Sequence, residues 1–533
     1  MRMLTPLLLA SLVLLGGCQK QTEASRTGLI YCSEGAPQTF NPQLANSGAT
    51  LDASARPLYD RLLESDPATL TLRGGLALDW AVSEDGLTYT LNLRQDVLFH
   101  HTAWFSPSRP FNADDVVFTW QRLLDNLHPY HHVSGGQYPY FSSLGLDQLL
   151  RQVRANGSHQ VVFELNRPDA SFLATLASDY AVVLSAEYGQ AMLAAGTPAL
   201  LDSRPIGTGP FRFKAYRHNE FIRFERHPGY WRGPAPLEQL VYDITPKSSK
   251  RLAKLLTGEC DVMSYPSASQ LSVIQQHDDL TLAVQPGMNV AFLALNTRKP
   301  PFNKVQVRQA IASAINVPNL LQAVYFGTGQ GANSLLPPRS WGYDPSSPVR
   351  KQDLARARAL LEEAGLPQGF EMQVLVGPGS RPYNPDALKT AQLIRNDLAE
   401  VGIRLRIVQQ EDPVIEQRLR RGNYDSLLSG WMADNADPDN FFRQLLSCNA
   451  VAQGNNDSRW CNPAFDQLLD DAVGSGQLSF RLRNYYYAQR MLNEQLPLIP
   501  LAHALRIQAS RKDVLGLELM PFGGTSFNQV HRK

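Results

Sequence analysis

Residues 429–443 read S-G-W-M-A-D-N-A-D-P-D-N-F-F-R, and they place three carboxylates among large aromatic rings. Asp434, Asp437 and Asp439 lie between Trp431 and a pair of phenylalanines, directly after an apolar run. A short strand ending in such a loop would hold carboxylates beside aromatic walls, which suits a cationic or amine-bearing ligand in a partly dry cavity. A solvated turn is the alternative, because Asp, Asn and Pro are turn formers and the stretch contains an Asp-Pro pair.

Length and composition describe an ordinary globular protein without a strongly charged partner. A chain of 533 residues is too long for one compact core, so we expect two or three domains. Hydrophobic residues make up 43% and charged residues 19%. Lys and Arg total 50 against 49 for Asp and Glu, a formal net charge of +1, so nothing in the charge balance favours nucleic-acid binding.

The N-terminus has the layout of a bacterial export signal. Arg2 precedes an apolar run, which ends in Leu-Gly-Gly-Cys at 15–18 and is followed by a polar stretch. The run is too short to span a bilayer as a stable anchor. The small residues before Cys18 resemble a lipobox, so we expect residues 1–17 to be removed and Cys18 to be acylated, with two or more acyl chains giving firm membrane attachment. A plain cleaved signal with an incidental Cys18 is the alternative.

The other four cysteines fit an exported protein. Cys32, Cys260, Cys448 and Cys461 are an even number for an oxidising compartment. Three pairings are possible, and we expect Cys448 to pair with Cys461 across a short polar Gly/Asn-rich segment and Cys32 to pair with Cys260. A zinc site is the competing interpretation, but no Cys-x-x-Cys motif or Cys/His pair at metal spacing accompanies them.

Apolar runs, alternation and helical spacing predict strands that alternate with helices, which is typical of α/β domains with largely parallel sheets. A helix is expected after Asn112, which is placed as an N-cap ahead of two aspartates. We read the glycines at 206–211 as a tight backbone crossing, because no helix or Lys-Ser/Thr follows to make a phosphate site. The strands are expected at 27–31, 87–93, 161–165, 211–213, 221–225, 240–244, 291–295, 371–376 and 404–408, and further helices at 58–64, 172–180, 250–256, 305–315, 353–364 and 387–401.

Motifs for catalysis are missing from the sequence. It contains no Gly-x-Ser-x-Gly, His-Glu-x-x-His, Walker lysine loop or dinucleotide Gly-x-Gly-x-x-Gly. We therefore expect no enzyme, no catalytic residues and no cofactor. A cluster of histidines offers a metal or haem site in principle, but adjacent histidines seldom face the same way, which favours surface loops. These histidines are His100, His101, His128, His131 and His132.

Four blocks of sequence resemble the peptide-binding proteins of bacterial ABC importers, solute-binding protein family 5, over nearly the whole mature chain. Within this family the chain is similar both to dipeptide-binding proteins and to the Sap-type proteins linked to antimicrobial-peptide uptake. The segments at 31–35 and 133–136 favour the first type, whereas 255–262, 441–443 and 521–523 favour the second. The four blocks are 111–118, 205–211, 299–310 and 429–442.

The resemblance implies an α/β fold, namely a two-lobed periplasmic binding protein of type II in the three-domain cluster C variant, with the ligand in the cleft between the lobes. Residues 18–30 would form the acylated cysteine and a linker. The remaining chain would divide into lobe I (31–62, 205–286 and 505–533), an extra domain inserted in lobe I (63–204), and lobe II (287–504).

The resemblance also implies how a peptide would be held. The peptide's amino group would pair with Asp434, which follows Gly-Trp after two residues, and its carboxylate would pair with Arg381 in an Arg-Pro-Tyr-Asn-Pro context. One Asp and one Arg at fixed positions would thus select ligands of one length, because the two charges of the ligand must reach both residues. We expect Trp431 to wall the site, with Gly430 and Tyr138 as further peptide contacts, and no metal.

The expected function is that of an extracytoplasmic, lipid-anchored binding protein that passes short peptides to an inner-membrane ABC permease. The expected location is the periplasm of a Gram-negative-type envelope, and the expected state is a monomer. A carrier of haem, of metal or of cationic antimicrobial peptides on the same fold is the alternative, and it would not need both charges of a free peptide.

Overall fold

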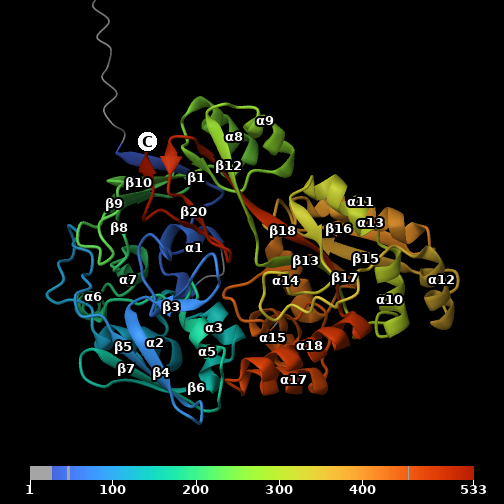
Figure 1. Cartoon of the computed structure of the whole chain (residues 1–533), viewed down its shortest axis with the longest axis horizontal. Helices are drawn as coiled ribbons and strands as arrows, with labels where there is room; N and C mark the ends of the chain where they lie inside the picture. The colour runs from blue at the N-terminus through green and yellow to red at the C-terminus, as the bar shows by residue number, and fades with distance from the viewer. Residues whose placement is uncertain (1–26, 45–47, 454) are drawn as a thin grey trace, which may run out of the picture.

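One long strand, β18 (Leu498–Arg511), joins the two halves of the molecule (Figure 1). In the computed structural model, which describes residues 27–44, 48–453 and 455–533, β18 pairs with β13 and β14 along its first half and with β11 and β12 along its second. The result is one 12-stranded sheet in the order β16-β15-β17-β13-β18-β11-β1-β10-β9-β8, with β12 and β14 also paired to β18. Both lobes are therefore built on one sheet.

Lobe I is formed around the end of this sheet that holds the first strand of the chain. Strand β1 pairs in parallel with β10 and β11, whereas β8, β9 and β10 form an antiparallel meander. The elements are β1 (Gly28–Ser33), α1 (Gly48–Ser54), β8 (Phe211–Arg217), β9 (Phe221–Arg226), β10 (Gln239–Ile244), α8 (Ser248–Thr257), β11 (Val262–Met263), α9 (Leu271–Gln275), β12 (Leu280–Pro286), β19 (Val514–Leu515), β20 (Glu518–Leu519), β21 (Thr525–Ser526) and β22 (His531–Arg532).

The extra domain is centred on a separate four-stranded sheet with the order β4-β5-β7-β6. Its buried side chains belong to the same hydrophobic core as those of lobe I, so the two are packed as one body. The elements are β2 (Leu63–Ser65), β3 (Leu72–Gly74), β4 (Ala77–Val82), β5 (Thr88–Leu93), α2 (Ala113–Leu124), α3 (Pro139–Ser143), α4 (Leu146–Leu149), β6 (Leu150–Ala155), β7 (Gln160–Leu165), α5 (Phe172–Leu176), α6 (Ala186–Ala194) and α7 (Leu200–Ser203).

Lobe II surrounds the other end of the large sheet and has two cores of its own. Helices α10, α12 and α13 share one of these cores, and α15, α17 and α18 share the other. The elements are β13 (Asn289–Leu295), α10 (Val305–Ala314), α11 (Val317–Leu320), β14 (Gly329–Gly331), α12 (Leu354–Glu363), β15 (Glu371–Val376), α13 (Ala387–Ala399), β16 (Arg404–Gln409), α14 (Asp412–Arg421), β17 (Ser426–Met432), α15 (Asp439–Leu446), α16 (Cys448–Gln453), α17 (Pro463–Val473) and α18 (Leu478–Gln495).

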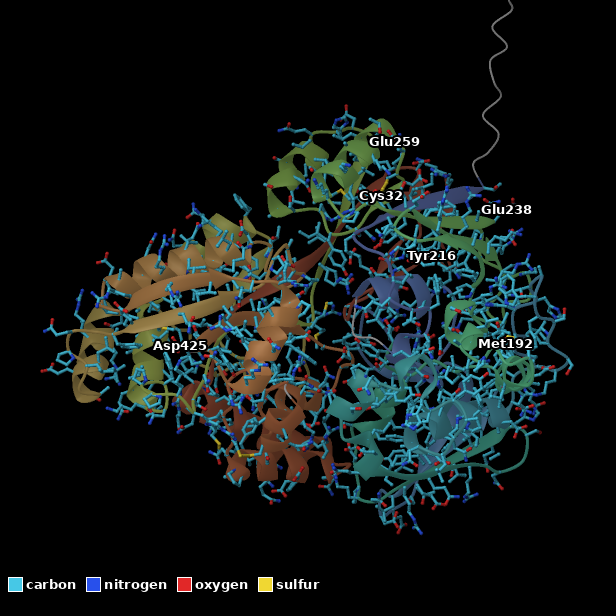
Figure 2. All side chains as sticks on the ribbon, turned by 180° about the vertical axis from the view of Figure 1, so that it is seen from behind. Cys32, Met192, Tyr216, Glu238, Glu259 and Asp425 are labelled. Atoms are coloured by element: carbon cyan, nitrogen blue, oxygen red, sulfur yellow. A yellow bond between two sulfur atoms is a disulfide. The ribbon has the colours of Figure 1, made fainter. Side chains whose placement is uncertain are left out.

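Two disulfides form in the expected pairing. Cys32 at the end of β1 is bonded to Cys260 beyond α8, with Cα atoms 5.9 Å apart, at the corner of lobe I labelled in Figure 2. Cys448 is bonded to Cys461, with Cα atoms 4.5 Å apart. Cys18 and the export signal lie outside the described residues. No helix in the described part of the chain is long and apolar enough to cross a membrane.

The glycine-rich segment at 206–211 makes a close backbone crossing, as the sequence predicts. A Cβ on Gly207 would lie 2.0 Å from the Leu58 carbonyl oxygen, and one on Gly209 would lie 2.5 Å from the Leu58 carbonyl carbon. The Gly209 N–H donates to the Leu58 carbonyl at 3.0 Å. Only glycine allows two chain segments to approach so closely.

Three expectations about the elements are wrong. The large sheet is mixed rather than largely parallel, because β18 runs antiparallel to all four of its partners and β13 runs antiparallel to β17. Residues 58–64 form turns and the start of β2 rather than a helix, and Arg61 and Glu64 face each other in a buried ion pair. Helix α5 ends at Leu176 instead of residue 180, and the following turns bring Asp179 and Tyr180 to the cleft described next.

Candidate functional site

A cavity of about 440 Å³ lies between the lobes beside β18, and we call it the cleft cavity. Glu34, Arg251 and Tyr265 line it from lobe I, Arg381 lines it from lobe II, and Arg506 lines it from β18. Its volume is typical of a site for a small ligand. Three arginines against one carboxylate suit an anionic group in this cavity.

Strand β17 leads from the core of lobe II to the cleft. Its first residues are buried, and residues 429–432 are half-buried. A Cβ on Gly430 would lie 2.2 Å from Cδ2 of Tyr383, so the Tyr383 ring covers the strand where only glycine leaves room for it. Because Tyr383 comes two residues after Arg381, this contact ties the Arg381 loop to β17.

Arg381 is held at the cleft by that loop and is paired with a carboxylate that a ligand could replace. Its backbone exchanges two hydrogen bonds of 3.0 Å with Asn384, and the Tyr325 hydroxyl donates to the Tyr383 carbonyl at 2.8 Å. Nη2 donates to both oxygens of Asp412, at 2.6 and 2.8 Å. Burial lowers the pKa of Arg381, but Asp412 outweighs burial and leaves the pKa raised. Both side chains are more than a third exposed, so this pair is weak.

Asp434 follows β17 and is oriented by one amide. The Asn440 side chain donates from Nδ2 to Asp434 Oδ2 at 3.2 Å. Its Oδ1 accepts from the Asp434 N–H at 3.0 Å and from Trp431 Nε1 at 3.2 Å. Burial raises the pKa of Asp434 to about 7, because the hydrogen bond from Asn440 only partly opposes it and the nearby Asp179 adds to it. Within the described chain, no basic side chain forms an ion pair with Asp434.

The extra domain supplies the wall opposite Asp434. The rings of Tyr140 and Tyr180 are stacked, with centroids 4.4 Å apart and planes 15° apart. Burial raises the pKa of both phenols, and the charge of Asp434 raises it further. The charge of Asp434 therefore acts on both rings, which belong to the extra domain. Aromatic faces beside a carboxylate stabilise an ammonium group.

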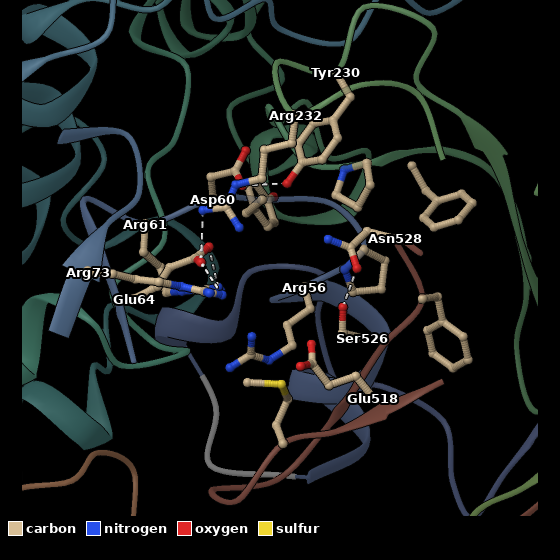
Figure 3. Close-up of a pocket in the computed structure, with 16 residues that line it drawn as sticks. Arg56, Asp60, Arg61, Glu64, Arg73, Tyr230, Arg232, Glu518, Ser526 and Asn528 are labelled. Atoms are coloured by element: carbon tan, nitrogen blue, oxygen red, sulfur yellow. Dashed lines mark hydrogen bonds and ion pairs between the residues drawn. The ribbon is translucent and has the colours of Figure 1, made fainter. Parts of the chain in front are cut away.

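Asp179, which lies beside these tyrosines, is held by buried charges behind the cleft. Its Oδ1 contacts Arg56 Nη2 at 2.9 Å and Arg61 Nη1 at 3.2 Å. Figure 3 shows these arginines around a second, much smaller cavity of about 40 Å³, where Glu64 pairs with Arg61 and with Arg232. That cavity is too small for a peptide. Arg56 and Arg61 thus fix Asp179, and the small cavity beside them offers no second ligand site.

The other two carboxylates of the 429–443 stretch are taken up by structural ion pairs. Asp437 accepts from Arg481 Nη2 at 2.7 and 2.9 Å and from the Tyr485 hydroxyl at 3.2 Å, all from α18. Asp439 pairs with Arg443 one turn later in α15, at 2.8 Å. Both carboxylates are buried. Of the three, only Asp434 has no arginine partner among the described residues.

Gly430 and Trp431 lie on β17 just ahead of Asp434, but of the predicted peptide contacts only Arg381 lines the cleft cavity, and Tyr138 lies elsewhere. Trp431 is half-buried against the lobe II core, with its indole N–H bonded to Asn440. Tyr138 is only 5% exposed within the core shared by lobe I and the extra domain. Its hydroxyl donates to the His131 carbonyl at 2.8 Å and accepts from Arg122 Nε at 3.2 Å. Its expected peptide contact thus has no support from this geometry.

The histidines considered as metal ligands make other contacts. His100 is buried and bonds the Gly209 carbonyl at 2.9 Å and the Gly207 N–H at 3.2 Å, which secures the glycine crossing. The His131 ring bonds the Arg122 carbonyl at 2.8 Å. Among the residues that the structure describes, no group of three or more His, Cys, Asp or Glu side chains is arranged to hold a metal ion.

Several residues of the site were not predicted from the sequence. Asn440 stands inside the 429–443 stretch, but only the folded loop shows that it orients Asp434. Tyr140, Asp179 and Tyr180 come from a part of the chain with no local motif, and Arg506 lies inside a strand. Their role follows from contacts across the cleft, for which the sequence carries no spacing signal.

Comparison with known proteins gives consistent matches over most of the chain. Residues 71–453 match the family described as bacterial extracellular solute-binding proteins, family 5 Middle. The chain is 46% identical over 507 residues to the peptide transport periplasmic protein SapA of Salmonella typhimurium strain LT2, covering 95% of this chain and 92% of that protein. It is 43% identical over 502 residues to the dipeptide-binding protein of Escherichia coli K12, covering 94% of each.

A solved structure supports the same assignment. The crystal structure of a dipeptide-binding protein from Pseudoalteromonas sp. SM9913 in complex with Met-Leu superposes with a TM-score of 0.88. The two sequences are 47% identical, and the match covers 95% of this chain and all of that one. The likeness to this protein therefore holds for the fold and for the amino-acid sequence.

Proposed function

The chain belongs to family 5 of the bacterial extracellular solute-binding proteins, and from this membership we propose that it captures short peptides outside the cytoplasm and delivers them to an ABC importer. It has the type II periplasmic binding protein fold of that family. The proposal draws on relatives that are named for peptide transport and dipeptide binding, and on a solved relative that holds Met-Leu.

The observation that carries the proposal is the opposed charge at two places in the cleft. Asp434 presents a carboxylate with no basic partner in the described chain, beside the stacked Tyr140 and Tyr180. Arg381 presents a guanidinium to the cleft cavity, where its own carboxylate partner Asp412 is half exposed. A free peptide carries the complementary pair, an ammonium at one end and a carboxylate at the other.

In this proposal the peptide's amino group binds Asp434 and its carboxylate displaces Asp412 from Arg381. Asn440 and Trp431 position the Asp434 loop, and Gly430 lets Tyr383 hold the Arg381 loop against β17. Ligand contacts to both sides of the cleft stabilise the closed arrangement. We assign the protein no catalytic residues and no resident cofactor.

The cellular setting belongs to the same proposal. Relatives named periplasmic support a periplasmic location. Residues 1–17 would be cleaved, and acylation of Cys18 would anchor the mature chain to a membrane. The protein would act as a monomer with an inner-membrane permease, and its division into lobe I, extra domain and lobe II at the boundaries given above is part of the proposal.

Titration calorimetry of the mature chain with Ala-Ala, N-acetyl-Ala-Ala and Ala-Ala amide tests this function. The protein is first freed of carried-over ligand by partial unfolding and refolding. We expect Ala-Ala to bind and each blocked peptide to lose about 2 kcal/mol or more, because a buried charge is left unpaired. Equal binding of free and blocked peptides would contradict the two-charge clamp and would point to a carrier of another kind.

A further inference from the structure

Arg506 is a buried cation whose guanidinium is only partly satisfied. Its side chain is on β18, 5% exposed, and it lines the cleft cavity. Nη2 donates to the Gly524 carbonyl at 3.2 Å, and the guanidinium carbon lies 5.7 Å from the centre of the Tyr265 ring. Nε and Nη1 are buried and have no hydrogen-bond partner among the described residues. A buried guanidinium with free donors is costly unless an anion joins it.

Arg251 and Arg381, the other two arginines at the cleft cavity, have partners of their own, whereas Glu34 Oε2 is buried without a hydrogen-bond partner among the described residues. Arg251 donates to the backbone carbonyls of Thr245, Pro246, Ser264 and Tyr265. Burial raises the pKa of Glu34, and a backbone hydrogen bond, Ser264, Arg251 and Arg506 lower it again, with Arg251 acting more strongly than Arg506. Arg381 is paired with Asp412. No carboxylate of the described chain lies within ion-pair distance of Arg506.

Asp52 on α1 is the remaining carboxylate that acts on Arg506. Burial, followed by the charge of Glu34, raises the pKa of Asp52 to about 8, and the charge of Arg506 and the hydrogen bond from the Tyr31 hydroxyl at 3.3 Å only partly oppose this. Asp52 is therefore mostly protonated at neutral pH.

Arg506 lies close to the end of β17 and also lines the cavity that Arg381 lines. A Cβ on Gly523 would lie 3.6 Å from Arg506 Nη1 and 3.5 Å from Cε of Met432, so Arg506 and Met432 meet at that glycine. Met432 ends β17, two residues before Asp434. On the other side, Arg506 shares the cleft cavity with Arg381. A peptide whose carboxylate is held at Arg381 would therefore occupy the same cavity as the Arg506 guanidinium.

We propose that Arg506 forms a second anion subsite in the cleft, which selects short peptides carrying an Asp or Glu side chain in addition to their terminal carboxylate. The side-chain carboxylate would accept hydrogen bonds from the free Nε and Nη1 of Arg506, a charge-assisted contact in a desolvated setting. The inference rests on the proposed peptide-binding function and adds the class of peptide that the site prefers.

The wild-type protein alone gives the first test, by calorimetric titration with Ala-Ala, Ala-Glu, Glu-Ala and the matched peptides Ala-Gln and Gln-Ala. We expect at least one acidic peptide to bind about tenfold tighter than its glutamine counterpart, since charged hydrogen bonds contribute about 1.5–3 kcal/mol. Failure of Ala-Ala to bind would overturn the proposed function itself. Binding of Ala-Ala with no preference for Glu over Gln would overturn the subsite alone.

Two variants then locate the preference. Arg506→Met should reduce the ratio of Glu to Gln affinities to about one while keeping most of the affinity for Ala-Ala, and Arg506→Lys should restore part of that ratio. Arg511→Met is the matched control, because Arg511 stands on the same strand, outside the cleft cavity, and pairs with Asp279 at 3.0 Å. An undiminished preference in Arg506→Met, with thermal unfolding showing a folded protein, would contradict the assignment.

Discussion

Among the three carboxylates in the 429–443 stretch, Asp434 is set apart by its surroundings rather than by its spacing. Asp437 and Asp439 each have an arginine within 2.8 Å, whereas the side chain of Asp434 is bonded, within the described part of the chain, by the neutral Asn440. Burial without a cation raises the pKa of Asp434 to about 7. An incoming ammonium would lower that pKa again, so peptide binding and the charge of Asp434 are linked.

This linkage predicts how peptide affinity depends on pH. Below about pH 7 Asp434 is increasingly protonated in the free protein, so the affinity for a free-amine dipeptide should fall toward tenfold for each further pH unit. Above about pH 8 the peptide's own α-amino group loses its proton, so affinity should fall again. Calorimetry in buffers of different ionisation enthalpy should detect proton release by the protein below pH 7. Affinity that is flat from pH 5 to 7 would contradict the role of Asp434.

Gly430 gives a second prediction at this scale. In Gly430→Ala the new Cβ meets the Tyr383 ring at 2.2 Å, so the ring and the Arg381 loop must shift. We expect a loss of stability of about 1–3 kcal/mol, together with weaker binding of free dipeptides. Urea unfolding and calorimetry measure the two effects. Gly476→Ala, where the Cβ would meet nothing within 4 Å, is the matched control and should change neither.

At the scale of elements, α15 is fixed to α18 by the buried pair of Asp437 and Arg481 just before the start of α15. Both side chains are less than a tenth exposed, and the Tyr485 hydroxyl shares the contact. This pair sets where α15 begins and therefore where Asn440 stands relative to Asp434. Ligand recognition by the loop thus depends on helix packing behind it.

Breaking that pair should destabilise lobe II. Asp437→Ala leaves Arg481 buried without a carboxylate, and we expect a loss of about 3–5 kcal/mol in the free energy of unfolding. The control is Glu371→Ala, because Glu371 pairs with Arg404 on the surface, with both side chains more than 70% exposed, and should change stability by less than about 1 kcal/mol. Denaturant unfolding measures the free energy of unfolding of both variants. Equal effects in both variants would show that burial of the pair does not matter.

Elements with strong local signals were predictable from the sequence. The helices after Asn112 and Asp353 begin where those side chains accept a hydrogen bond from the first turn, and the alternating segment at 87–93 forms β5. The segment at 58–64 was misjudged because its apolar residues are buried by long-range contacts with 206–211 rather than by a helical face. Mixed strand pairing was missed because β18 is far from its partners in sequence.

In the candidate site, too, local sequence patterns reveal some residues, and long-range contacts determine the others. The loop with Asp434 and Trp431, and the turn with Arg381, could be proposed because each is a short contiguous pattern and the family resemblance adds a role to it. Tyr140 and Arg506 could not, since their importance comes from residues that approach across the cleft. Tyr138, two residues before Tyr140, was named instead, and its side chain points into the core.

At the scale of the whole molecule, one sheet carries both lobes while loops and helices meet across the cleft. Arg339 of lobe II donates from Nη2 to the carbonyls of Pro67 and Ala68 in the extra domain, at 3.1 and 3.0 Å. The Ala170 N–H donates to the Val473 carbonyl at 2.7 Å. These polar contacts hold the arrangement in which Asp434 faces the stacked tyrosines, so they contribute to affinity without touching the ligand.

Removing the Arg339 contact should favour opening of the cleft. We expect Arg339→Ala to weaken dipeptide binding by about fivefold, since two hydrogen bonds stabilise only the closed form, at about 1 kcal/mol in total after solvent competes for the donors. Small-angle scattering of the unliganded variant should show a larger radius of gyration than the wild type. Arg358→Ala, which loses a contact to Glu400 within lobe II, is the control and should change neither quantity.

The central claim is that Asp434 recognises the peptide's amino group, and a cycle of one substitution and one ligand change tests it most directly. Calorimetric titration would compare the wild type and Asp434→Asn, each with Ala-Ala and with N-acetyl-Ala-Ala. We predict that either change alone weakens binding by about 2 kcal/mol or more, and that the second change then adds little, because both remove the same contact. Asp434→Asn protein that binds Ala-Ala as tightly as the wild type, or fully additive losses, would contradict the account.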